Sequence, residues 1–88
     1  MALAAIDVLS AGDRNFILLV EAGKVDWALH ANNLDCAIGE VREADRAFVA
    51  VMNALRKLDP ELKESAVLVT SDHGHLLRPD MDGIRRLR

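Results

Sequence analysis

The sequence predicts an α/β fold: a fragment of a mostly parallel sheet that contains a helix–strand–helix–strand (βαβ) unit. Two short apolar runs, 16–20 and 66–70, carry bulky or β-branched side chains, which is typical of strands buried on both faces of a parallel sheet. A long stretch with helical periodicity separates the two runs. Parallel strands joined in this way form a βαβ unit, whose crossover is expected to be right-handed.

Apolar spacing defines each expected helix. Apolar residues share one helical face over 2–9, and Gly12 follows soon after them, so the first helix is expected there. The first strand follows at about 15–20. Apolar residues then recur at steps of three and four over 34–58, which predicts a helix of about 25 residues. Pro60 ends that helix, because the residue before a proline avoids the helical region and proline cannot continue the hydrogen-bond ladder.

The size of the chain limits how much of such a fold it can complete. At 88 residues it is at most one domain. Two strands do not make a stable sheet, because three or more strands or a covering layer are normally required. We therefore expect residues 1–88 to form one partial domain: either a fragment of a larger α/β domain or a subunit that partners complete. Residues 77–88 are expected to form a flexible tail.

Composition excludes several classes of protein. With 51% hydrophobic and 28% charged residues the chain is typical of a soluble globular protein. Its net charge of −3 gives no footprint for nucleic acid. No apolar stretch approaches the roughly 20 residues of a membrane span, and the first residues lack the basic region of a signal peptide. The single cysteine, Cys36, cannot form an intrachain disulfide and is expected as a small, buried side chain on the long helix.

Acidic residues and histidines follow each of the two apolar runs. In chain order they are Glu21, Asp26, His30, Asp72, His73 and His75. If a helical turn begins at Asp26, its side chain shares a face with that of His30, because residues four apart meet on a helix. Parallel strands end at the same sheet edge, so the two groups are expected side by side. Carboxylate with imidazole suits zinc, whereas Glu21 with further oxygen ligands suits magnesium.

Electrostatic repulsion strengthens the expectation of bound cations. Three carboxylates, those of Glu21, Asp26 and Asp72, would repel one another by roughly 3 kcal/mol per pair at separations of about 5 Å and an effective dielectric near 20. That is a large share of the stability of a small domain. Three outcomes are open at this point: cations neutralise the carboxylates, their pKa values rise, or the two loops move apart.

Four segments of the chain closely resemble the alkaline phosphatases. They are 19–26, 30–33, 40–45 and 69–75, and the resemblance extends from about residue 2 to residue 76. It implies a three-layer α/β fold and hydrolysis of phosphate monoesters with two zinc ions and one magnesium ion. The site residues that it implies are Glu21 for magnesium, Asp26 and His30 for the first zinc, Asp72 and His73 for the second zinc, and His75 as an outer residue that holds a carboxylate in place.

The chain departs from the family pattern in what it lacks. The motif of the nucleophilic serine, the phosphate-binding arginine and the metal-bridging aspartate are absent from these residues, so no catalytic residue is assigned. Ser10 and Ser71 do not have the matching context. The chain alone is therefore expected to have little or no turnover and to need a complementary segment or an oligomeric partner. The family is typically periplasmic or extracellular, although no export signal is visible here.

Other interpretations of the same residues stay open. The acids could be solvated loop carboxylates and the histidines surface or turn residues. The apolar seam of the long helix could serve helix-mediated assembly, with the ligands as remnants. A third alternative is a different phosphoryl or sulfuryl transferase, because a shared metal core does not fix the substrate. Trp27 is expected to pack over the first loop rather than to form a substrate platform.

Overall fold

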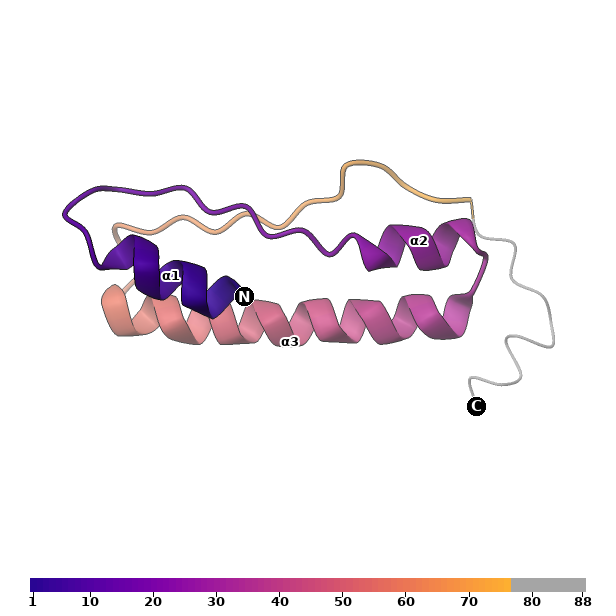
Figure 1. Ribbon diagram of the computed structural model, residues 1–88, viewed down its shortest axis with the longest axis horizontal. Coiled ribbons are helices and arrows are strands. Elements are labelled where there is room, and N and C mark those ends of the chain that lie inside the picture. The colour runs from indigo at the N-terminus through magenta and orange to yellow at the C-terminus, as the bar shows by residue number, and fades with distance from the viewer. Residues whose placement is uncertain (77–88) are drawn as a thin grey trace. The chain divides into compact units, whose positions relative to one another are not determined.

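The computed structural model describes residues 1–76, and within them the regular elements are three helices (Figure 1). Helix α1 spans Ala2–Ser10, α2 spans Lys24–His30 and α3 spans Leu34–Leu58. The chain divides into two compact units. The first unit consists of Met1–Glu21 with Asp45–Leu68; the second consists of Ala22–Ala44 and, among the described residues, 69–76. The expected tail, 77–88, lies outside the described residues.

The two helices expected from apolar spacing are confirmed. Helix α1 ends at Ser10, one residue beyond the expected range, and α3 has the predicted bounds. Helix α3 stops at Leu58, two residues before Pro60, as the steric restriction before a proline requires. The helical turn considered at Asp26 belongs to α2, which begins two residues earlier, at Lys24.

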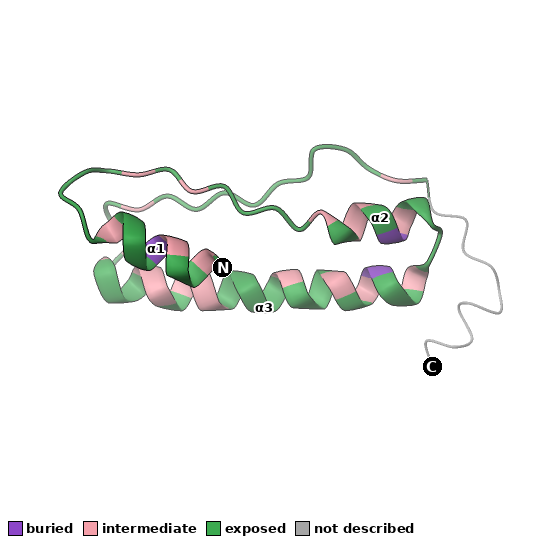
Figure 2. Ribbon diagram, viewed as in Figure 1, coloured by how far each residue is buried: buried purple, intermediate pink, exposed green. Residues whose placement is uncertain are grey.

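The expected α/β class with its βαβ unit is wrong: no residue between 1 and 76 lies in a strand. The runs 15–20 and 66–70 are non-helical connections. Their apolar side chains lie largely in solvent, with Ile17 97%, Leu19 89% and Leu68 92% exposed (Figure 2). Strands this apolar need cover on both faces and further strands to pair with, whereas these side chains stay largely exposed and residues 1–76 form no other strand.

Few side chains are buried among the described residues. In the first unit the buried hydrophobic residue is Ile6, on α1, and in the second unit Ala28 and Ala37 are buried, on α2 and α3. Cys36 is exposed, contrary to the burial expected for it. Because burial of apolar surface is the main favourable term in folding, so small a core indicates a marginally stable chain.

A capped loop follows α3 in the first unit. The backbone N–H of Lys63 donates to one carboxylate oxygen of Asp59 at 3.1 Å, and the N–H of Glu64 donates to the other at 2.9 Å. The hydrogen bond from Glu64, and after it those from Lys63 and Ser65, hold the pKa of Asp59 below its ordinary value against the opposing effect of burial. The carboxylate thus closes the loop that leads into residues 66–70.

Replacing Asp59 with alanine is expected to lower the melting temperature followed by helical circular dichroism at pH 7. A lowered folded-state pKa means that the stabilisation is complete above the unfolded pKa of about 4 and is lost as pH falls through the folded value. The variant should therefore also lose part of its acid dependence. Asp59→Asn keeps one acceptor oxygen and should melt between the two. Identical melting of the alanine variant and the parent chain at pH 7 would contradict this role.

Candidate metal centre

Helix α2 places two of the expected ligands on one face. Asp26 lies in its first turn and His30 in its last, and the helix dipole favours an acid near the N-terminus. Residues four apart are neighbours on a helix. Accordingly, His30 Nε2 lies 3.5 Å from Asp26 Oδ1. The spacing read from the sequence thus corresponds to a real side-chain pair.

The other histidines lie on a turn that short polar side chains shape. Thr70 Oγ1 donates to the carbonyl oxygen of Ser71 at 3.2 Å, and Ser71 Oγ donates to that of His73 at 2.5 Å. Hydroxyl groups that bond to nearby backbone in this way favour turns over regular structure. The turn brings His73 and His75 toward α2 within the second unit.

Asp26 is the centre of the resulting cluster. His75 Nε2 donates a hydrogen bond to Asp26 Oδ1 at 2.7 Å, and His73 Nε2 lies 3.7 Å from the same oxygen. The ring of His75 contacts those of both other histidines, with centroids 4.6 Å from His30 and 5.0 Å from His73. One carboxylate oxygen is therefore within 3.7 Å of a nitrogen from each of the three histidines.

The surroundings of Asp26 favour its ionised form. The hydrogen bond from His75, together with the charges of His30, His75 and His73 when protonated, holds the pKa of Asp26 below its ordinary value although burial opposes this. The side chain of His75 is 15% exposed, the lowest value among the three histidines. The centre is thus a shared carboxylate with one sheltered imidazole and two more accessible ones.

The remaining expected ligands are placed less closely. Asp72 Oδ2 lies 3.4 Å from His73 Nε2, and the side chain of Asp72 is largely exposed. Glu21 is an exposed residue that ends one segment of the first unit. Its role as a magnesium ligand stays a prediction, as do the roles of the other five residues in binding particular ions.

The chemistry of the donor set fits a metal ion. Asp26, His30 and His75 each offer one ligand atom, and these atoms lie within 4.8 Å of one another. Ligand atoms about 2.0 to 2.2 Å from a tetrahedral zinc stand roughly 3.3 to 3.6 Å apart, so the widest of these separations would have to shorten when an ion binds. Two imidazole nitrogens with one carboxylate oxygen form a combination that zinc accepts. Exposed acidic groups also occur without a bound metal ion.

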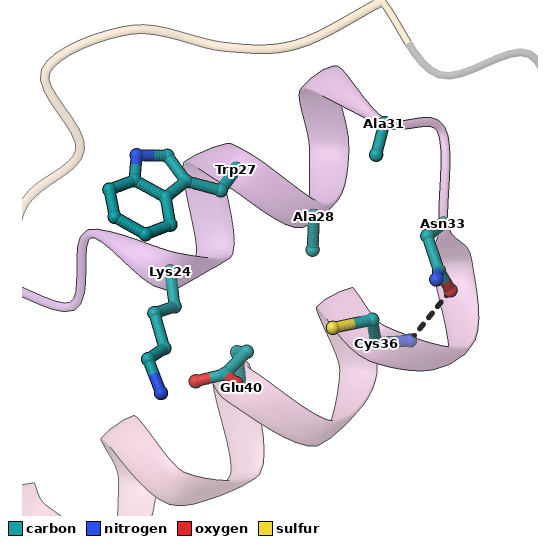
Figure 3. A pocket seen from close by; sticks show the side chains of 7 residues that line it. All are labelled: Lys24, Trp27, Ala28, Ala31, Asn33, Cys36 and Glu40. Carbon is teal, nitrogen blue, oxygen red and sulfur yellow. Dashed lines mark hydrogen bonds between the residues drawn. The ribbon is translucent and has the colours of Figure 1, made fainter.

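A cavity lies on another side of α2, in the second unit (Figure 3). It measures about 230 Å³, and its lining residues are Lys24, Trp27, Ala28, Ala31, Asn33, Cys36 and Glu40. Trp27 stands at its edge and is 73% exposed, so the packing role expected for this residue is wrong. None of the clustered acids and histidines lines the cavity. The cavity could not be predicted from the sequence, because its walls come from two helices and the turn between them. The spacing of apolar residues alone does not determine how two helices pack.

A carboxylate approached by three histidine nitrogens, on a helix and a polar turn, has the ligand types of a metal-binding site. The chain belongs to the alkaline phosphatase family, whose model matches residues 1–84. It is 42% identical over 73 residues to a membrane-bound alkaline phosphatase of Bombyx mori, with 83% of this chain and 12% of that protein covered. It is 34% identical to alkaline phosphatase 4 of Bacillus subtilis, with 83% and 15% covered. The human tissue-nonspecific isozyme is 33% identical over 76 residues, with 86% and 14% covered.

These comparisons confirm the predicted family, but they cover only a small part of each relative. The chain spans about an eighth to a sixth of the length of the curated relatives it matches. No solved structure matches it significantly. Within residues 1–76, none of the helices has the length and apolar character needed to cross a membrane.

Proposed function

We propose that this chain is the metal-binding part of a phosphomonoesterase, with phosphate monoesters as the substrates of the complete enzyme. The single observation that carries the proposal is the approach of three histidine nitrogens to one oxygen of Asp26. A chain of the alkaline phosphatase family that gathers these residue types in one place has the donor set that a zinc centre needs.

The proposed assignment follows the family resemblance. Each residue keeps its predicted role: Glu21 for magnesium, Asp26 and His30 for the first zinc, Asp72 and His73 for the second zinc, and His75 as the outer partner of Asp26. Although His75 lies close enough to offer a ligand atom, in this assignment it bonds to the carboxylate and not to the ion. The 2.7 Å hydrogen bond between His75 and Asp26 supports the last of these roles. A hydrogen bond from an outer residue fixes the orientation of a carboxylate that binds a metal ion.

The residues of this chain would act by holding the metal ions and by orienting the side chains that bind them. Zinc bound there would polarise the phosphate oxygens and lower the pKa of a nucleophile, which is the chemistry that two-metal centres supply. Asp26 and His30 hold one position from a single helix face, while Asp72 and His73 present a second position from the neighbouring turn. His75, the most sheltered of the three histidines, keeps Asp26 ionised and correctly turned.

We also propose that the isolated chain binds metal without turning over substrate. The 88 residues contain no nucleophile motif of the family type. The large exposure of Ile17, Leu19 and Leu68 supports a need for covering polypeptide, either a complementary segment or a further copy of the chain. A zinc titration by calorimetry tests the metal proposal: the parent chain should bind with micromolar or tighter affinity, and the double variant Asp72→Ala with His73→Ala should lose a binding site. No binding by the parent chain would contradict the proposal.

Replacing His75 with alanine is expected to weaken zinc binding by about 10- to 100-fold, the usual cost of removing an outer partner of a ligand. Replacing His30 with alanine should cost more, because it removes a ligand itself. Calorimetry on both variants measures the difference. If His75→Ala abolished binding while His30→Ala kept it, the two histidines would have exchanged roles.

The chain loaded with zinc and magnesium is expected to hydrolyse p-nitrophenyl phosphate no faster than the metal-loaded buffer. The physical reason is that the bound phosphate would meet no positioned nucleophile from these residues. Turnover above background that Asp72→Ala abolishes would overturn the claim of inactivity, whereas turnover that survives this change would indicate a contaminating phosphatase.

A further inference from the structure

A turn of three residues, 31–33, connects the helix of the metal cluster to α3. At the end of α2 the N–H of Asn32 donates to the carbonyl oxygen of Leu29 at 3.0 Å, and the N–H of Asn33 donates to that of Ala28 at 2.9 Å. Asn32 has a φ of 50°, in the left-handed region. These two bonds with one left-handed residue form a Schellman motif, a common way for a helix to satisfy its last carbonyls. Asparagine suits the position, since it tolerates left-handed backbone better than other side chains.

The same turn starts the next helix. Asn33 Oδ1 accepts a hydrogen bond from the N–H of Cys36 at 3.0 Å, the dashed line of Figure 3, and the carbonyl oxygen of Asn33 accepts from Ala37 at 3.0 Å. Asn33 is therefore the N-cap of α3, at which asparagine is among the preferred residues. One residue thus contributes to the end of α2 and to the beginning of α3.

The turn bears directly on where His30 lies. His30 is the last residue of α2, two residues before Asn32, and it reaches Asp26 only if the helix stays formed up to that point. Helix α2 has seven residues and no side-chain hydrogen bond capping its N-terminus. Isolated helices of this length are unstable in water, so the fraction of molecules in which α2 is formed depends strongly on the hydrogen bonds that cap its ends.

We propose that Asn32 and Asn33 are positioning residues of the metal centre: by ending α2 and starting α3 they hold His30 beside Asp26. The proposal rests on the metal-binding function proposed above. Asn32 acts through its backbone conformation and Asn33 through its cap, and neither is a ligand. Disrupting the turn lowers the population of the binding-competent arrangement, and the apparent metal affinity falls by the same factor.

The test compares Asn32→Val with Asn32→Gly in the 88-residue chain. Valine is strongly disfavoured at a φ of 50°, whereas glycine adopts it readily. The zinc dissociation constant from calorimetry should rise roughly 5- to 30-fold in the valine variant and stay near the parent value in the glycine variant. Asn33→Ala should weaken binding, and Asn33→Ser, which restores an N-cap, should recover it. Asn53→Val, at an exposed position within α3, serves as the control and should leave zinc affinity unchanged.

A metal-free measurement separates this inference from the function on which it rests. The rings of His30 and His75 contact each other edge to face, so their protons should give a nuclear Overhauser effect without metal. Loss of that signal in Asn32→Val and its retention in Asn32→Gly supports the inference even if the parent chain binds no zinc, an outcome that contradicts the proposed function alone. Retention of the signal in both variants, or equal zinc affinity of Asn32→Val and the parent, overturns the inference.

Discussion

Replacing Asp26 with alanine is expected to weaken zinc binding by at least about 100-fold, more than the loss of an outer partner costs. The reason is geometric, because Asp26 Oδ1 is the atom that the nitrogens of His30, His73 and His75 approach within 3.7 Å. Without the carboxylate, only neutral imidazole nitrogens are left, and the anionic ligand that offsets the charge of the ion is lost. Calorimetric titration with zinc at pH 7 measures the change.

Two further variants separate the loss of a ligand from the loss of a charge. Asp35→Ala removes the same charge from an exposed position in the first turn of α3, in the same unit, and should leave zinc affinity nearly unchanged. Asp26→Asn keeps the shape of the side chain without its charge and should fall close to the alanine variant. If Asp26→Ala bound zinc within a factor of three of the parent chain, Asp26 would not be the centre of the site.

The helices could be read from the sequence because their signals are local. The spacing of apolar residues over 34–58 and the steric effect of Pro60 act within a few residues, and α3 has the bounds they predict. The runs 16–20 and 66–70 also have a clear composition, but a strand exists only through hydrogen bonds to another strand. The residue types of a run do not show whether a partner strand is present. Among the described residues none is, and the two apolar runs are exposed connections.

The site was partly predictable for the same reason. The spacing of Asp26 and His30 is a helical neighbour relation, and the structure places the two side chains 3.5 Å apart. The approach of His75 to Asp26 joins residues 49 positions apart. The two groups were expected side by side because of a parallel sheet that residues 1–76 do not form, and the role of His75 beside a carboxylate came only from the resemblance to a known family. Asn33 was detectable, since an asparagine just before an apolar helical run is a typical N-cap signal. The exposure of Trp27 and Cys36 could not be predicted from the neighbouring residues in the sequence, because it depends on how the helices pack.

Zinc is expected to act as a folding ligand, raising the free energy of unfolding by about 4 kcal/mol at a thousandfold excess over its dissociation constant. For a chain with so few buried residues this is a large share of total stability. The contact between Asp26 and His75 connects α2 to residues 69–76, so a shared ion would fix both segments at once. Thermal melting should show the gain, chelation should reverse it, and Asp26→Ala should not show it. Amide hydrogen exchange locates the effect: protection should rise first in 24–30 and 69–76, and zinc binding that left the exchange of both segments unchanged would show that the ion is held elsewhere.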